Sequence, residues 1–401
     1  MNRRPALGMA LLGSGLIAVT YGLARFAFGL FLPSIREDMA ISPELAGAIG
    51  SIPFASFVLA ILLGPPLVRA VGAKMGGVTA IALALAGLAT IASAPGPLML
   101  AVGVAVCGVA TGLSTPSMAA AVHWVVPKAK RGRVNAAVNA GTSIGVALSG
   151  PAVLLLADAW RPAYLGFAAV AGVGVLAAAW FLPAYAKPAP HANTAGGPSR
   201  QQWLDMIRLS ALAAATGFVS ALYWVFGPDF AVQAGGLAAR DSAWMWLAVG
   251  VGGMAGGAAG DLIAKHGPAS SHAFATAAMA ASLTLLAADP GNLVLVLFSA
   301  ATFGAAYMTL TGIYLVGGTE IMPSHPALGS VMPFLAVAAG QVAGSSASGW
   351  MIAETGHSTA FGSFAAFGLG VALVSLWLTV AGQTGNTEDD AHPAGATAEE
   401  G

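Results

Sequence analysis

The chain has 401 residues, of which 57% are apolar and 8% are charged, and 53 are glycines. A soluble globular domain carries about 25% charged residues, so this composition excludes an ordinary soluble protein. Sixteen Lys and Arg residues balance sixteen Asp and Glu residues, leaving no net charge to attract nucleic acid. The lone Cys107 excludes an internal disulfide framework and a thiolate metal cluster. We therefore expect an integral membrane protein with no cofactor.

Twelve apolar segments follow one another along the chain, bounded by proline, glycine or charged residues. Each is long enough for a spanning helix, which needs about 20 mainly apolar residues. Their high Gly and Ala content is typical of helices that pack closely in lipid, and such long runs disfavour a β-barrel. The predicted spans cover residues 7–32, 45–68, 76–94, 98–122, 134–157, 162–182, 206–226, 242–260, 268–288, 293–317, 329–353 and 359–381.

The first apolar segment has two interpretations. Arg3 and Arg4 precede it, as basic residues precede the core of a cleavable signal peptide. The segment is longer than such a core, and eleven more spans follow it. We therefore interpret it as a retained first helix.

Lys and Arg residues are distributed unevenly between the two sides that these spans define. With a cytoplasmic N-terminus, the cytoplasmic side receives Arg3, Arg4, Arg69, Lys74, Lys128, Lys130, Arg131, Arg133, Lys187, Arg200, Arg208 and Lys265. The other side receives only Arg36, Arg161 and Arg240. Cytoplasmic loops carry the excess of basic residues, so we expect both termini in the cytoplasm and a bacterial inner-membrane location.

The longest polar break between spans divides the chain into two halves of six spans each. Residues 183–205 are rich in Pro and Gly and predict a cytoplasmic linker between bundles at 1–182 and 206–381. The polar, aromatic-free segment 382–401 predicts a disordered tail.

The two halves also resemble each other. Pro33 and Pro228 close the first span of each half, and Pro95 and Pro290 break each half at a later turn. Both pairs are 195 residues apart. An internal duplication of six spans is typical of secondary transporters, with a substrate site between the repeats.

Short polar segments near the span ends carry a family resemblance. The segment from Pro65 to Lys74 follows the second span, and Gly257 to Asp261 follows the equivalent span of the second half. With Arg131-Gly132-Arg133 and the turn from Asp158 to Tyr164, they resemble the signature loops of the major facilitator superfamily. The first loop departs from the family pattern, because Pro65 replaces a Gly and Arg69 stands where an Asp is usual.

The resemblance implies an all-α membrane protein with two pseudo-symmetric six-helix bundles around a central cavity. It implies alternating access, with the first and fourth helices of each half lining the cavity. It also places Asp261, Arg69, Arg131 and Arg133 in gating loops. Asp261 then pairs with Arg131 or Arg133 to close the cytoplasmic side, or is a solvated loop acid.

Arg25 is the charged residue that lies deepest inside a predicted span, with Tyr21 one helical turn earlier. A charge at the middle of the membrane costs about 2.5–3.5 kcal/mol on insertion scales, and it usually faces protein or water. The guanidinium fork matches a carboxylate or phosphate, which predicts an anion-binding role. The alternative is a structural Arg that bonds to neighbouring carbonyls.

Other spans carry polar side chains at helical spacing, which places each set on one face. These residues line a water-filled cavity or bond the helices to one another. Tyr223 and Trp224 belong either to the cavity wall or to an interfacial belt. The candidate substrate-binding set is Arg25, Tyr21, Thr111, Asn139, Tyr223, Trp224, Tyr307, Thr311, Tyr314 and Gln341.

No carboxylate lies at the centre of a predicted span, where a proton relay needs one. The nearest titratable substitute is His123, at the end of the fourth span. The sequence therefore favours exchange or facilitated movement of a small organic anion by a monomer. The alternatives are an efflux carrier for amphipathic compounds and, from another class, a membrane receptor. The sequence shows no catalytic set and no cluster with metal-ligand spacing, so we do not expect an enzyme.

Overall fold

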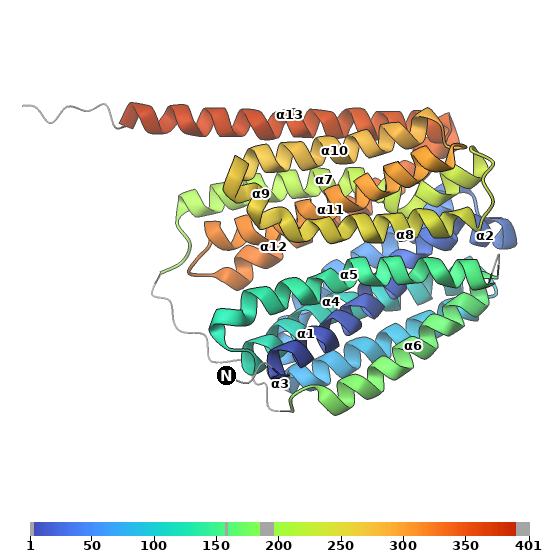
Figure 1. Ribbon diagram of the computed structural model, residues 1–401, viewed down its shortest axis with the longest axis horizontal. Coiled ribbons are helices and arrows are strands. Elements are labelled where there is room, and N and C mark those ends of the chain that lie inside the picture. The colour runs from blue at the N-terminus through green and yellow to red at the C-terminus, as the bar shows by residue number, and fades with distance from the viewer. Residues whose placement is uncertain (1–3, 157–158, 185–195, 390–401) are drawn as a thin grey trace, which may run out of the picture.

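The computed structural model describes residues 4–156, 159–184 and 196–389, and this part of the chain is helical with no strand. The helices run side by side, with the first half of the chain in the lower part of Figure 1 and the second half above it. In the first half they are α1 (Arg4–Ile17), the π-helical segment η1 (Ala18–Phe26), α2 (Ala27–Met39), α3 (Pro43–Ala92), α4 (Pro97–Val125), α5 (Lys128–Leu156) and α6 (Trp160–Phe181).

The second half repeats this succession of helices. It contains α7 (Arg200–Gln233), α8 (Asp241–Gly253), the 3₁₀ segment η2 (Met254–Ala258), α9 (Ala259–His266), α10 (Pro268–Ala288), α11 (Leu293–Ile321), α12 (Pro326–Thr355) and α13 (His357–Asp389). Segments α1, η1 and α2 together form the first span, and α8, η2 and α9 form the eighth.

Two glycine turns show that α3 is a pair of spans. Within the described residues, eleven helical segments are long and apolar enough to cross a membrane, and one of them is the 50-residue α3. Gly72 has φ 84° and ψ 163°, outside the helical region, so the chain reverses there. Gly267 has nearly the same conformation (φ 78°, ψ 161°) between α9 and α10. Counting α3 as two, the twelve predicted spans are confirmed, in two pseudo-symmetric bundles.

Close helix contacts also follow the repeat. A methyl group on Gly22 would overlap the backbone of Gly145 on α5, and one on Gly340 of α12 would overlap the backbone of Ala214 on α7. Gly22 and Gly217 are 195 residues apart, as are Gly145 and Gly340. Each half therefore uses glycine to bring its first and fifth spans into backbone contact, as small residues allow in membranes.

Several predicted boundaries were wrong. Pro33 and Pro228 do not end their spans, because α2 continues to Met39 and α7 continues to Gln233. Spanning helices tolerate proline where neighbouring groups satisfy the freed carbonyl. Pro65 and Pro66 likewise lie within α3, and the chain turns at Gly72 instead. The first span is therefore longer than the predicted 7–32.

The predicted linker and tail lie partly outside the described residues, which omit 185–195 and 390–401. Within the described part, α7 already begins at Arg200, inside the predicted linker, after a capping box at Ser199. Helix α13 continues to Asp389, inside the segment predicted to be disordered.

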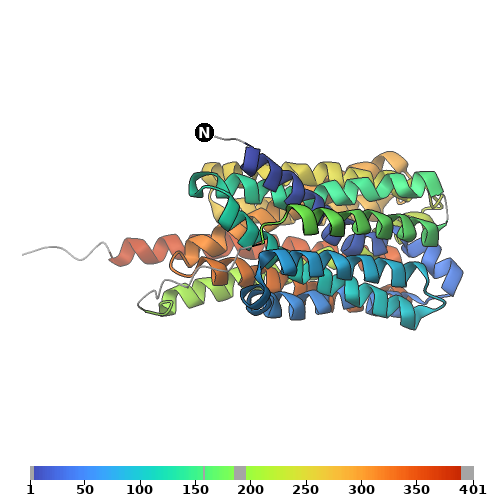
Figure 2. The same cartoon turned by 90° about the horizontal axis from the view of Figure 1, so that it is seen from below.

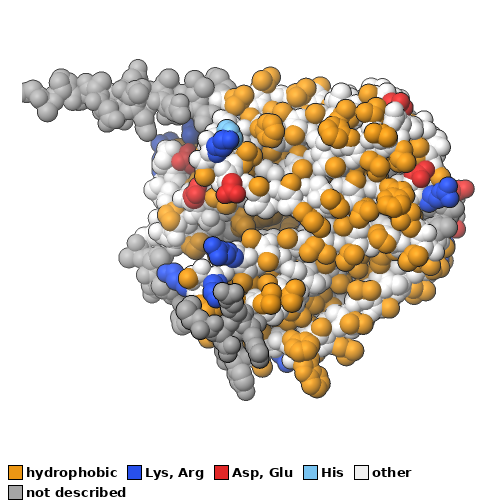
Figure 3. Space-filling model, in the orientation of Figure 1, with side chains coloured by type: hydrophobic (Ala, Val, Ile, Leu, Met, Phe, Trp, Pro, Cys, Tyr) orange, Lys and Arg blue, Asp and Glu red, His pale blue; other side chains and the backbone are white. Residues whose placement is uncertain are grey.

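Charged side chains lie at the two ends of the molecule, and apolar side chains cover the flank between them (Figure 3). Figure 2 shows the helices of both halves running along this same direction. We call the end that carries Arg69, Lys74, Arg131, Arg133 and Lys265 the basic face. The other end, with Arg36, Asp38, Arg161 and Asp229, is the opposite face.

Candidate functional site

Arg25 lies on the π-helical segment η1 and is 5% exposed. Because α2 continues to Met39, Arg25 is about 21 Å from that end of its span at 1.5 Å per residue. π-Helical turns are rare and frequently occur at functional sites. The structure thus places the guanidinium deeper in the spanning region than the predicted span implied.

A hydrogen-bonded chain joins Arg25 to the second half. Its Nη2 donates to Oε1 of Gln341 on α12 over 3.1 Å, and Nε2 of Gln341 donates to the hydroxyl of Tyr307 on α11 over 3.1 Å. The guanidinium only donates, so the amide oxygen must face Arg25 and the amide nitrogen must face Tyr307. The proton of the Tyr307 hydroxyl is therefore left for another acceptor.

Aromatic rings surround the guanidinium. Its carbon lies 4.3 Å from the ring centroid of Phe57, 4.9 Å from that of Phe54 and 5.7 Å from that of Tyr21. Cations at such distances over aromatic faces gain about 0.5–2 kcal/mol. The rings stabilise the cation without neutralising it.

The charge of Arg25 has no acidic partner among the described residues, where no carboxylate oxygen lies within 4 Å of it. One of its five N–H groups donates to a described residue, and Nε is buried without an acceptor. Buried charges are normally paired, and buried donors are normally bonded. This site can therefore accept an anion with several acceptor atoms.

Trp224 of α7 lies among aromatic rings from both halves. Its ring stacks on Phe26 with centroids 4.1 Å apart and meets Tyr307 edge-on at 5.2 Å. Trp246 lies against it at 5.6 Å, and both tryptophans are buried. Trp224 is therefore buried, and its place in a cavity wall stays a prediction.

The other predicted binding residues lie apart from Arg25 and bond within their own halves. Thr111 donates to the carbonyl of Thr20, and Thr311 donates to that of Met308. The Tyr223 hydroxyl bonds to Ser299 on α11, and Asn139 is exposed on α5. Except for Asn139, these side chains connect helices or turns in this conformation. Their role in binding stays a prediction.

Tyr314 belongs to a second buried polar cluster, centred on His272 of α10. His272 Nε2 lies 2.8 Å from the Tyr314 hydroxyl, and His272 Nδ1 lies 2.8 Å from Oγ of Ser375 on α13. The Tyr314 hydroxyl also donates to Thr216 on α7 over 2.6 Å. His123 is therefore not the titratable group nearest to a span interior. A lone His in an Ala-rich segment gave no pattern that sequence reasoning could have used.

An ion pair joins the halves at the opposite face. Asp229 of α7 is fully buried and accepts hydrogen bonds from Arg36 of α2 and from His357 of α13, the latter over 3.0 Å. Pro228 was predicted to close this span, so the next residue, Asp229, was not expected inside a helix. The 195-residue repeat did not indicate this cluster either, since it pairs unlike residues.

The predicted gating residues at the basic face make no ion pair with one another in the described structure. Asp261, Arg69 and Arg133 are exposed, and Asp261 lies in the first turn of α9 and not in a loop. Arg131 donates to the carbonyl of Val126 and contacts His123. A gating role for these residues stays a prediction.

Twelve spanning helices in two repeated halves, with a buried polar site between them, define a polytopic membrane transport protein. The family model of the Major Facilitator Superfamily matches residues 15–332, and the chain belongs to this family. Membership indicates a transporter of small molecules and not an enzyme. No curated protein matches the chain.

Solved transporter structures share the fold. The nucleoside transporter NupG has 15% identity and a TM-score of 0.76, covering 94% of this chain and 99% of its own. A bacterial homolog of the human lysosomal transporter Spinster, inward-facing and unoccupied, has 15% identity and a TM-score of 0.68, covering 95% and 96%. A POT family transporter in complex with 5-aminolevulinic acid has 11% identity and a TM-score of 0.75, covering 92% and 95%. Identities this low show the fold alone.

Proposed function

We propose that this transporter moves a small organic anion by alternating access, through exchange or facilitated transport, with Arg25 as the charge anchor. The observation that carries the proposal is a buried guanidinium, between the halves, that has an unpaired Nε donor and no carboxylate partner among the described residues. Its fork binds carboxylate or phosphate oxygens in pairs. Gln341 holds the fork in place but leaves its charge for the substrate.

The residues around Arg25 suit a substrate with an apolar part as well as an anionic group. Phe26, Phe54 and Phe57 surround the guanidinium and shield it from water, which strengthens its attraction to an anion. The hydroxyl of Tyr307 has a proton to donate to a second acceptor on the substrate.

Contacts between the halves support a conformation closed at the opposite face. The hydrogen bonds between described residues of the two halves are Arg25 to Gln341, Arg36 to Asp229, and Ser345 to the carbonyl of Gly47. All three hydrogen bonds lie either at the level of Arg25 or between that level and the opposite face.

On the basic-face side of Arg25, Ile61 of α3 still packs with Ala338 of α12, but no hydrogen bond between described residues joins the halves there. Ser143 of α5 still lies against Gly253 of α8, yet Asn139, one turn closer to the basic face, is exposed. None of the residues of η2 (Met254–Ala258) is buried. We propose that substrate reaches Arg25 from the basic face here, and that breaking the Arg36–Asp229 pair opens the other side.

We further propose that the basic face is cytoplasmic, because positive charge gathers on the cytoplasmic side of membrane proteins. This orientation puts both chain termini in the cytoplasm of a bacterial inner membrane, with the transporter acting as a monomer. The Arg36–Asp229 pair is then on the external side, and the conformation is open inward.

Uptake and exchange in proteoliposomes test the proposal. Wild type, Arg25→Ala and Arg208→Ala are compared across a panel of carboxylates and phosphate esters, each with its neutral amide or alcohol. Arg208 is an exposed arginine of α7 that pairs with Asp205, so it is the matched control. We expect wild type and Arg208→Ala to transport at least one anion and Arg25→Ala to transport none. Transport of that anion by Arg25→Ala at the wild-type rate would overturn the anchor role.

A further inference from the structure

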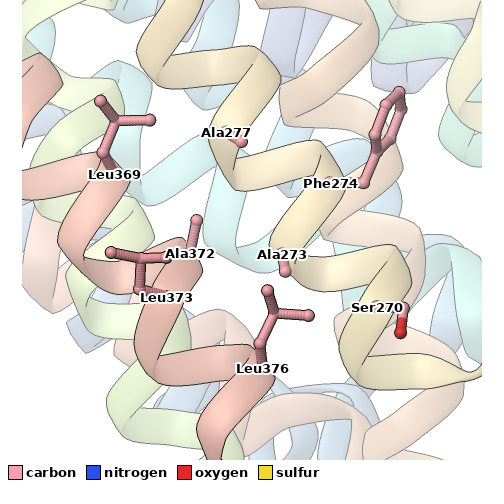
Figure 4. A pocket seen from close by; sticks show the side chains of 8 residues that line it. All are labelled: Ser270, Ala273, Phe274, Ala277, Leu369, Ala372, Leu373 and Leu376. Carbon is pink, nitrogen blue, oxygen red and sulfur yellow. The ribbon is translucent and has the colours of Figure 1, made fainter.

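A groove on the membrane-facing flank lies between α10 and α13 (Figure 4). It holds about 480 Å³. The residues that line it are Ser270, Ala273, Phe274 and Ala277 of α10, and Leu369, Ala372, Leu373 and Leu376 of α13. The lining is apolar apart from the Ser270 hydroxyl, so the groove suits a hydrocarbon chain.

The walls of this groove face the lipid and not the central site. Phe274 and Leu373 are each 68% exposed, although both are large and apolar. Small side chains, Ala273 and Ala277, lie between them and leave room for an occupant (Figure 4). In a bilayer the medium next to such a surface is hydrocarbon, and an unfilled groove would forfeit dispersion contacts.

Positive charge lies where the groove approaches the basic face. Lys265 and His266 are the last residues of α9, both exposed, and the Gly267 turn connects them to the start of α10. Ser270 lies in the first turn of α10. Asp261, one turn before Lys265, makes no ion pair with it. An anionic headgroup would thus meet a cation at the level of the membrane surface.

We propose that the α10–α13 groove binds an anionic phospholipid, with an acyl chain between Phe274 and Leu373 and the phosphate beside Lys265 and His266. This site is separate from the Arg25 site and does not depend on the proposed substrate. Its occupant stabilises the packing of α10 on α13.

Native mass spectrometry of the purified protein, titrated with phosphatidylglycerol or phosphatidylcholine of identical acyl chains, tests the site. One basic side chain near an anionic headgroup contributes about a fivefold preference. We expect wild type to prefer phosphatidylglycerol by about that factor and Lys265→Glu to lose the preference. Ala277→Trp, which fills the groove, loses one bound lipid of either kind. Ala82→Trp, at the repeat-related position of α3, is the matched control, and we expect it to keep the bound lipid.

Three outcomes would overturn the proposal. The first is an undiminished preference in Lys265→Glu, whose exposed position leaves the fold intact even if Ala277→Trp does not fold. The second is an unchanged lipid count in a folded Ala277→Trp variant. The third is a dimer that Ala277→Trp dissociates, because a second copy of the chain would then be the occupant.

Discussion

Two buried polar clusters in the spanning region differ in how fully their hydrogen bonds are satisfied. The His272 cluster lies within the second bundle, and both ring nitrogens have a hydroxyl within hydrogen-bond distance. The Arg25 cluster lies between the bundles, and among the described residues its cation donates one hydrogen bond, to Gln341, while Nε is buried without an acceptor. A satisfied network holds helices together, whereas an unsatisfied cation costs stability that only a ligand recovers.

The repeat sharpens this contrast. The position related to Arg25 in the second half is Ser220, which donates to the carbonyl of Gly217 within its own helix. The cation is therefore a feature of one half only, although the helix packing around it is duplicated. A requirement of the fold would be expected in both halves.

The largest effect is expected for Arg25→Gln. The substitution removes the buried charge but keeps a polar side chain that can bond to Gln341. Loss of one partner of a buried charged interaction costs 2–5 kcal/mol, so anion transport falls by about 100-fold. The melting temperature stays the same or rises, because an unpaired charge has been removed. Proteoliposome uptake and thermal unfolding measure the two quantities. A large fall in both the transport rate and the melting temperature would show that Arg25 is a structural residue.

Asp229→Asn is expected to have the next largest effect, on conformation. It weakens the pair with Arg36, so the opposite face opens more often. Spin labels at positions 37 and 354, in a Cys107→Ser background, report the separation there through electron–electron distance measurements. We expect the distances in Asp229→Asn to be longer than in wild type. We expect no change in the control Asp38→Asn, whose pair with Arg161 lies within the first half. Identical distributions in both variants would contradict the closing role.

Gly340→Ala tests the duplicated glycine contacts. The added methyl overlaps the backbone of Ala214, so α7 and α12 must separate. Overpacking of this kind costs about 1–3 kcal/mol, which lowers the melting temperature. Gly172→Ala on α6 is the control, because a methyl there meets nothing within 4 Å. Equal stability of the two variants would show that the contact is not tight.

His272→Gln is expected to have the smallest effect on transport. The amide replaces part of the hydrogen bonding to Tyr314 and Ser375, so unfolding free energy falls by about 1 kcal/mol. Anion uptake should stay within about twofold of wild type, since a shift of that size in stability leaves the folded fraction nearly unchanged. Uptake that disappears while folding is retained would move His272 into the transport mechanism.

The span pattern, the duplication and the presence of Arg25 inside a span were readable in the sequence, because each depends on hydropathy or on local spacing. Gln341 and Tyr307 were found as polar residues on helical stripes, but their chain to Arg25 depends on how the two halves pack. The Arg36–Asp229 pair was missed for a local reason, since Pro228 suggested a helix end where α7 continues. The π-helical turn that carries Arg25 leaves no sequence signal of its own.

The central claim is that Arg25 recognises a negative charge, and a cycle of four affinities tests it most directly. Isothermal titration compares the best-transported anion of the panel with its neutral primary amide, on wild type and on Arg25→Gln. The account predicts that wild type prefers the anion by at least about tenfold, because a buried charge-assisted hydrogen bond contributes about 1.5–3 kcal/mol. It also predicts that Arg25→Gln binds the two compounds equally. The same preference in both proteins would contradict it.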